Sequence, residues 1–210
     1  MRIPRRGRRG AWTRETVDEL AVYWKEAPGP FTASLLFRVG AADEELPTRG
    51  MSHLVEHLAF FPIGQVSYTA NGFIQELWSV FYAVGEKAEV LGFLTSLCGN
   101  LSELPLDRLE AEKRILTTEG ASRTPGWRER LLELRFGPRG FGLAAHEEYG
   151  LRTATAEDVE SWSNERFVKG NAALWMTGRP PTSSTSRCAR AGGARSLARS
   201  VGRGSSSPRI

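Results

Sequence analysis

The chain has 210 residues, of which 40% are hydrophobic, and a formal net charge of +4, which suits one sizeable soluble domain. No apolar run is as long as a membrane-spanning helix, and the basic N-terminus lacks the apolar stretch of a secretory signal, so no membrane partner is expected. The two cysteines, Cys98 and Cys188, are too few and too distant for a disulfide framework, which favours the cytoplasm.

The charge is distributed unevenly along the chain. Residues 1–14 hold six Arg and residues 179–210 hold seven, with no acidic residue in either segment. Taking these thirteen from the 28 basic residues leaves 15 against all 24 acidic ones, so residues 15–178 carry about −9. We therefore predict a basic N-terminal segment (1–14), a folded domain (15–178) and a disordered Arg/Ser/Gly-rich tail (179–210). The basic ends lack interleaved aromatic residues, so no specific nucleic-acid partner is expected.

The first half of the domain is predicted to contain strands around one helix. Residues 17–26 and 31–40, rich in β-branched and aromatic residues and separated by a Pro-Gly-Pro break, predict two antiparallel strands with a tight connection. A helix is predicted to follow, with Ser52 as its N-cap and its end near Phe61, before a proline. Two more strands are predicted at residues 65–75 and 77–85.

The second half of the domain is predicted to be mainly helical. Helices are expected at residues 88–101, from Pro105 to about Gly120, and after a Pro-Gly pair at 125–126. A capping-box-like start at Thr155 predicts a helix to about Phe167, and residues 171–178 predict a final strand. The elements together favour an α+β fold, with a mostly antiparallel sheet and helices packed on it.

One motif carries chemistry. His53-Leu54-Val55-Glu56-His57 places His53, Glu56 and His57 at positions i, i+3 and i+4, which share one face of a helix. Two imidazoles on one helical turn can hold half of a tetrahedral zinc shell, and a neighbouring carboxylate can take a proton from the water that the metal activates. The alternative is an amphipathic helix that carries two surface histidines.

A catalytic zinc site also needs a third protein ligand. His146 stands beside two acidic residues and is typical of a surface histidine, and Cys98 lies in an apolar stretch and is typical of a core thiol. Glu119 is predicted to share a helical face with Glu112, two turns earlier, and with apolar residues. A carboxylate there is costly unless it is paired or bound to a metal. Spacing alone does not decide between a ligand and a solvated helix face.

The stretch from Gly50 to Phe60 resembles the signature of the inverzincin metallopeptidases, the family of pitrilysin, insulin-degrading enzyme and the mitochondrial processing peptidase. The resemblance covers residues 15–178 and implies a single half-clamshell peptidase domain that hydrolyses peptides or small unfolded proteins with Zn²⁺. It implies the following roles: zinc ligands His53, His57 and Glu119, general base Glu56, supporting residue Glu112 and substrate-binding residue Asn71. Because the segment between the motif and Glu119 is shorter than is usual in the family, Glu110 and Glu133 stay open as alternative third ligands.

The family resemblance also implies a partner. Its members work as two related domains that close around a peptide, either in one chain or as two subunits. Only the first domain is recognised here, so we expect a second related domain or subunit, in a homo- or heterodimer. The alternative is an inactive or partner-dependent metal-binding half-domain, either a truncated fragment or one subunit of a heterodimer.

Overall fold

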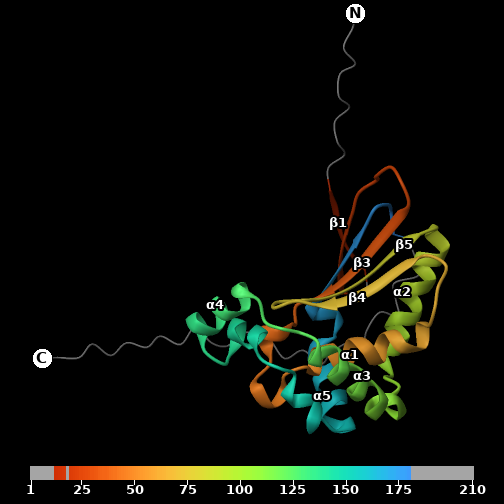
Figure 1. Cartoon of the computed structure of the whole chain (residues 1–210). Helices are drawn as coiled ribbons and strands as arrows, with labels where there is room; N and C mark the ends of the chain where they lie inside the picture. Colours follow the sequence, from red (N-terminus) through yellow and green to blue (C-terminus); the bar gives the residue numbers. More distant parts are fainter. Residues whose placement is uncertain (1–11, 18, 181–210) are drawn as a thin grey trace, which may run out of the picture.

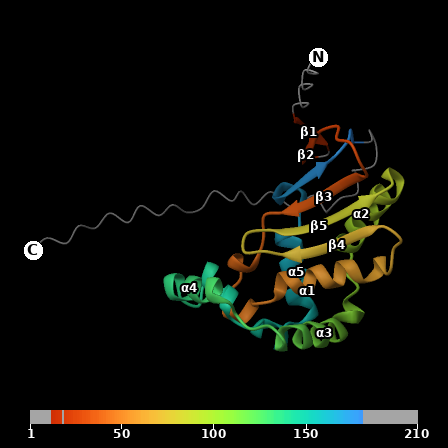
Figure 2. The same cartoon turned by 45° about the horizontal axis from the view of Figure 1, so that its top comes forward.

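The computed structural model describes residues 12–17 and 19–180, which form a six-stranded sheet with helices packed against it (Figure 1). In spatial order the strands are β1 (Thr13–Val17), β2 (Leu20–Trp24), β6 (Ala172–Met176), β3 (Phe31–Phe37), β5 (Ser79–Gly85) and β4 (Thr69–Ile74). Neighbouring strands are antiparallel except β2 and β6, which run parallel, and β4 forms one edge (Figure 2). The predicted α+β fold with a mostly antiparallel sheet is confirmed.

The prediction that residues 17–26 and 31–40 form a paired hairpin is wrong. β6 lies between β2 and β3 and bonds to both, with Leu174 opposite Val22 on one side and Leu35 on the other. The Pro-Gly-Pro segment between β2 and β3 contains two residues without a main-chain N–H, so only its glycine can donate to a hairpin ladder. Residues 17–26 also contain a break at Glu19, which has φ 70° and separates β1 from β2.

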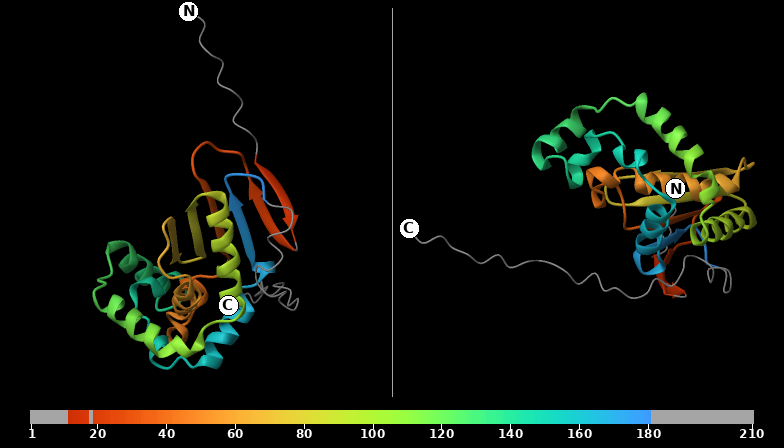
Figure 3. Two further views of the ribbon diagram at one scale, coloured as in Figure 1. Left: turned by 90° about the vertical axis from the view of Figure 1, so that its right-hand side faces the viewer. Right: turned by 90° about the horizontal axis from the view of Figure 1, so that it is seen from below.

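The described part of the chain contains five α-helices. Their bounds are α1 (Met51–Phe60), α2 (Lys87–Ser102), α3 (Leu109–Ala121), α4 (Trp127–Phe136) and α5 (Ala156–Arg166). Figure 3 shows α1 and α2 on the same side of the sheet. All five predicted helices are present, and Thr155 caps α5 by accepting from the Asp158 N–H at 3.2 Å, as the capping box predicts.

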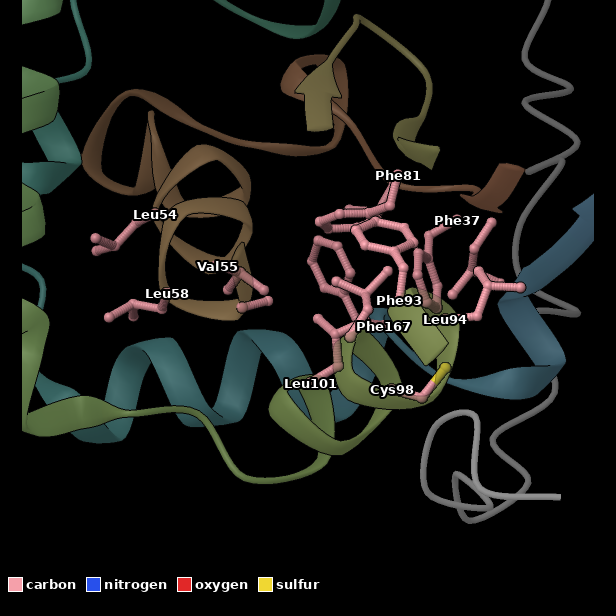
Figure 4. Close-up of a cluster of buried hydrophobic side chains, with 14 of the residues drawn as sticks. Phe37, Leu54, Val55, Leu58, Phe81, Phe93, Leu94, Cys98, Leu101 and Phe167 are labelled. Atoms are coloured by element: carbon pink, nitrogen blue, oxygen red, sulfur yellow. The ribbon is translucent and has the colours of Figure 1, made fainter. Parts of the chain in front are cut away.

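The core lies between the sheet and helices α1, α2, α3 and α5. Phe37 and Phe81 point from the central strands and meet Phe93 of α2 and Phe167 in one cluster, toward which Val55 of α1 is turned (Figure 4). Burying each phenyl ring contributes about 1.5–3 kcal/mol. This cluster holds α1 firmly beneath the β4 end of the sheet.

The start of α1 differs from its prediction. The N-cap is Gly50, with φ 99°, and Ser52 is already inside the helix and buried. The Glu44 carboxylate accepts the N–H groups of Gly50 at 3.0 Å and Ser52 at 2.8 Å. An external carboxylate therefore takes the place of the predicted serine cap.

The two predicted terminal segments fall mostly outside the described residues. Residues 1–11 and 181–210 are not described, and β1 begins at Thr13. The predicted domain boundaries therefore stay predictions. Within residues 12–17 and 19–180, no helix is long and apolar enough to cross a membrane.

Candidate metal centre

The face of α1 opposite the aromatic core carries the predicted motif. The His53 and His57 rings meet edge to face with their centroids 4.9 Å apart. Their Nε2 atoms lie 4.0 and 3.9 Å from one oxygen of the Glu56 carboxylate. The two imidazoles and the carboxylate thus converge on one point, as expected for positions i, i+3 and i+4.

Helix α3 brings a second carboxylate to this point. One Glu119 oxygen lies 3.8 Å from His57 Nε2. Ligand atoms of His53, His57 and Glu119 all lie within 4.8 Å of one another, the one such group of three among the described residues. Zinc bonds of about 2.0–2.2 Å place tetrahedral ligands roughly 3.4 Å apart. The Glu119 side chain is 54% exposed, so it has room to move closer to the two histidines and reach the spacing of tetrahedral ligands.

The other candidates for a third ligand lie elsewhere. Glu110 is exposed and bonds to Lys113 at 2.8 Å. Glu133, on α4, pairs with Arg130 at 3.0 Å and with His146 at 3.3 Å. Cys98 is buried in the core. Of Glu110, Glu119 and Glu133, Glu119 is therefore the one whose carboxylate lies beside the ring nitrogens of both motif histidines.

Each motif histidine is held at its other ring nitrogen by a carboxylate. Glu112, buried on α3, lies 3.2 Å from His57 Nδ1 and bonds to Arg108 at 3.2 Å. Glu148 lies 3.0 Å from His53 Nδ1. Such contacts orient metal-binding imidazoles and leave Nε2 free.

Sequence patterns do not identify Glu148 as a residue of the site. It stands 95 residues after His53, directly before the 3₁₀ segment Tyr149–Arg152, and no spacing rule connects the two. Its only local signal is the acidic pair that follows His146.

Burial and charge shift the site's protonation equilibria in different directions. Burial raises the pKa of Glu56 above its ordinary value, although the two motif histidines oppose the shift. Burial alone would lower the pKa of His53, but the hydrogen bond and charge of Glu148 outweigh it, so this pKa is raised. Burial acts to raise the pKa of Glu148, yet His53 and Arg49 bring it below the ordinary value. Glu148 therefore stays ionised, while Glu56 has the higher proton affinity that suits a general base.

Structural comparison places this geometry in a known fold. No family model and no curated protein matches the sequence. A protease from Helicobacter pylori superposes with a TM-score of 0.68 at 16% identity, over 82% of this chain and 47% of that chain. Pitrilysin superposes with a TM-score of 0.62 at 13% identity, over 89% of this chain and 23% of that chain. The chain has the fold of the pitrilysin-type peptidases.

The same fold occurs in other settings. Complex III2 from Candida albicans contains a chain that superposes with a TM-score of 0.67 at 14% identity, over 88% of this chain and 48% of that chain. The chain thus spans less than half the length of each of these three proteins. The pitrilysin-type fold is what they share, and any activity must be argued from this chain's own side chains.

The edge strand β4 runs beside the motif. Gly72 of β4 lies against Glu56, so close that a Cβ at this position would stand 2.2 Å from the carboxylate. Asn71 is exposed on the opposite face of the strand, and its Oδ1 accepts the Gly72 N–H at 2.9 Å. A cavity of about 550 Å³ extends from His53 along the end of β4 to Arg123 and the start of α4. An edge strand of the described sheet therefore runs beside the motif, and a cavity reaches His53.

Proposed function

We propose that this chain is a zinc-dependent endopeptidase domain that hydrolyses peptides or small unfolded proteins. The observation that carries the proposal is the convergence of two Nε2 atoms and the Glu119 carboxylate beside the buried Glu56. His53, His57 and Glu119 would hold the ion, a two-histidine, one-carboxylate set that suits catalytic zinc. A zinc ion bound there supplies Lewis acidity, which activates water and polarises a carbonyl.

The chain's own residues divide the remaining work. Glu56 takes the proton of the attacking water and later gives it to the leaving amine, because its carboxylate faces both histidine Nε2 atoms. The free edge of β4 binds the peptide main chain as an added strand, with Asn71 beside it. The cavity next to His53 receives a substrate side chain.

The proposal includes a partner. Because the chain spans between 23% and 48% of the length of the three compared proteins, we infer that a second related domain or subunit completes the substrate chamber, in a homo- or heterodimer. The competing proposal is a half-domain that binds metal and does not hydrolyse peptides. The occurrence of this fold in a complex III2 chain keeps that proposal open.

The test combines zinc content with peptide cleavage. The purified full chain is assayed for bound zinc and for cleavage of an unstructured fluorogenic peptide, as wild type and as Glu56→Gln. We expect one zinc in both and cleavage only in the wild type. Zinc without cleavage in the wild type favours the half-domain, and cleavage that survives Glu56→Gln contradicts the role of Glu56.

The third ligand is tested with matched variants. Glu119→Gln is expected to lose zinc, whereas Glu110→Gln, on the same helix, and Glu133→Gln are expected to retain it. Loss of zinc in either of the latter two, with retention in Glu119→Gln, would reassign the ligand.

A further inference from the structure

The contact between Glu148 and His53 has a counterpart at the other histidine. His57 Nδ1 faces Glu112, which is bonded to Arg108, and His53 Nδ1 faces Glu148, which lies 3.7 Å from Arg49. Two unrelated segments thus build the same imidazole–carboxylate–guanidinium chain. A repeated arrangement of this kind indicates a shared task at the two rings.

We propose that Glu148 is a positioning residue that fixes the tautomer and ring orientation of His53, with Arg49 holding Glu148 in place. The proposal rests on the proposed function in so far as His53 is a zinc ligand. An ionised carboxylate only accepts hydrogen bonds, so His53 Nδ1 must carry the hydrogen that Glu148 accepts. In the neutral ring, the Nε2 lone pair then points toward Glu119 and Glu56, where a metal would bind.

The backbone around Glu148 is built for close approach to the start of α1. A Cβ at Gly150 would lie 2.7 Å from the Pro47 carbonyl oxygen, and the Gly150 N–H donates to the Arg49 carbonyl at 3.0 Å. A Cβ at Gly50 would lie 2.7 Å from Glu148 Cβ. Two glycines thus allow the 3₁₀ segment to press Glu148 against the first turn of the motif helix.

Charge balance around Arg49 directs Glu148 toward the histidine. Arg49 is buried, and it donates to the Glu44 carboxylate at 2.9 Å and to the Leu143 carbonyl at 3.2 Å. Glu44 therefore takes the shorter ion pair, and Arg49 alone neutralises one of its two carboxylate neighbours. Glu148, with Arg123 lining the same cavity, is largely buried and is stabilised by a hydrogen bond from His53.

The decisive readout is the tautomer of His53 in the metal-free chain. Long-range ¹H–¹⁵N correlation spectra at pH 8 distinguish Nδ1–H from Nε2–H rings, and the chain has only three His to assign. We expect the Nδ1–H form in the wild type and a mixture in Glu148→Ala. Glu147→Ala is the matched control, because the Glu147 side chain is 68% exposed and pairs with Arg152 on the surface.

Zinc affinity, measured by competition with a chelator, provides the second readout. Removal of such an outer carboxylate weakens zinc binding by about 10–100-fold. The zinc affinity of Glu148→Ala is therefore expected to fall by a factor in this range, and that of Glu147→Ala to stay near the wild-type value. Glu148→Gln retains an acceptor and the shape of the side chain, so its zinc affinity is expected to lie between those of Glu148→Ala and the wild type. It replaces Glu148→Ala if that variant does not fold.

The two proposals fail in different ways. A His53 tautomer that is the same in the wild type and in both Glu148 variants overturns the positioning role, whatever the zinc affinity. A wild-type chain with the Nδ1–H tautomer and no affinity for zinc overturns the proposed function and leaves the contact with Glu148 intact.

Discussion

The buried Glu44 carboxylate offers a sharp test of how the motif helix is held. It is 3% exposed and serves three donors: Arg49, at 4% exposure, and the N–H groups of Gly50 and Ser52. Glu44→Ala leaves the buried Arg49 guanidinium with only the longer contact to Glu148, at 3.7 Å, and leaves two buried N–H groups unsatisfied. Breaking a buried pair in this way costs about 3–5 kcal/mol. At roughly 2–4 °C per kcal/mol for a domain of this size, Tm should fall by ~6–20 °C.

The assay is urea unfolding followed by circular dichroism, with the free energy of unfolding extrapolated to water. Glu45→Ala is the control, because Glu45 is the exposed neighbour and such substitutions change stability by no more than about 0.5 kcal/mol. If Glu44→Ala and Glu45→Ala unfold at the same urea concentration, the carboxylate does not hold the start of α1, and the reasoning fails.

Two further predictions concern stability at residues other than the proposed zinc ligands. Thr155→Ala removes the acceptor for the Asp158 N–H and should cost about 0.5–2 kcal/mol, which chemical unfolding measures; an unchanged midpoint would show that the cap is dispensable. The pKa of Glu76 is lowered by its hydrogen bond to Arg128, so its contribution to stability is complete above the pKa of the unfolded chain and is lost as the pH falls through the lower folded value. Glu76→Gln should therefore lower Tm at pH 7 and converge with the wild type in acid, and an equal Tm difference at both pH values would contradict this.

Local patterns predicted the elements well and their pairing poorly. The helix ends follow from nearby chemistry, such as the Thr155 cap of α5, which acts within three residues. The position of β6 between β2 and β3 depends on contacts between residues near 21 and 173, and an alternating strand pattern does not identify its neighbours. The predicted Ser52 cap is wrong for the same reason, because Glu44, the residue that accepts the first N–H groups of α1, lies outside the helix.

The same distinction between local patterns and long-range contacts applies to the candidate site. His53, Glu56 and His57 share a face because helical geometry requires it, and Glu119 joins them where α3 packs against α1. The resemblance to a family supplied Glu119, since spacing alone left it undecided. Glu148 could not be predicted as a site residue, because neither helical periodicity nor the recognised motif extends to the loop that carries it.

The central place of β6 has a consequence for how the chain folds. Ala21 and Ala173 are paired across the sheet, so β2 and β3 acquire their shared neighbour only after about 150 more residues have been made. At roughly 5–20 residues per second, a ribosome needs ~8–30 s for that interval. During that time the inner edges of β2 and β3 lack their partner, and exposed strand edges invite pairing with other chains. The sheet is therefore completed late in synthesis, and the inner edges of β2 and β3 are open to aggregation or chaperone binding until β6 has been made.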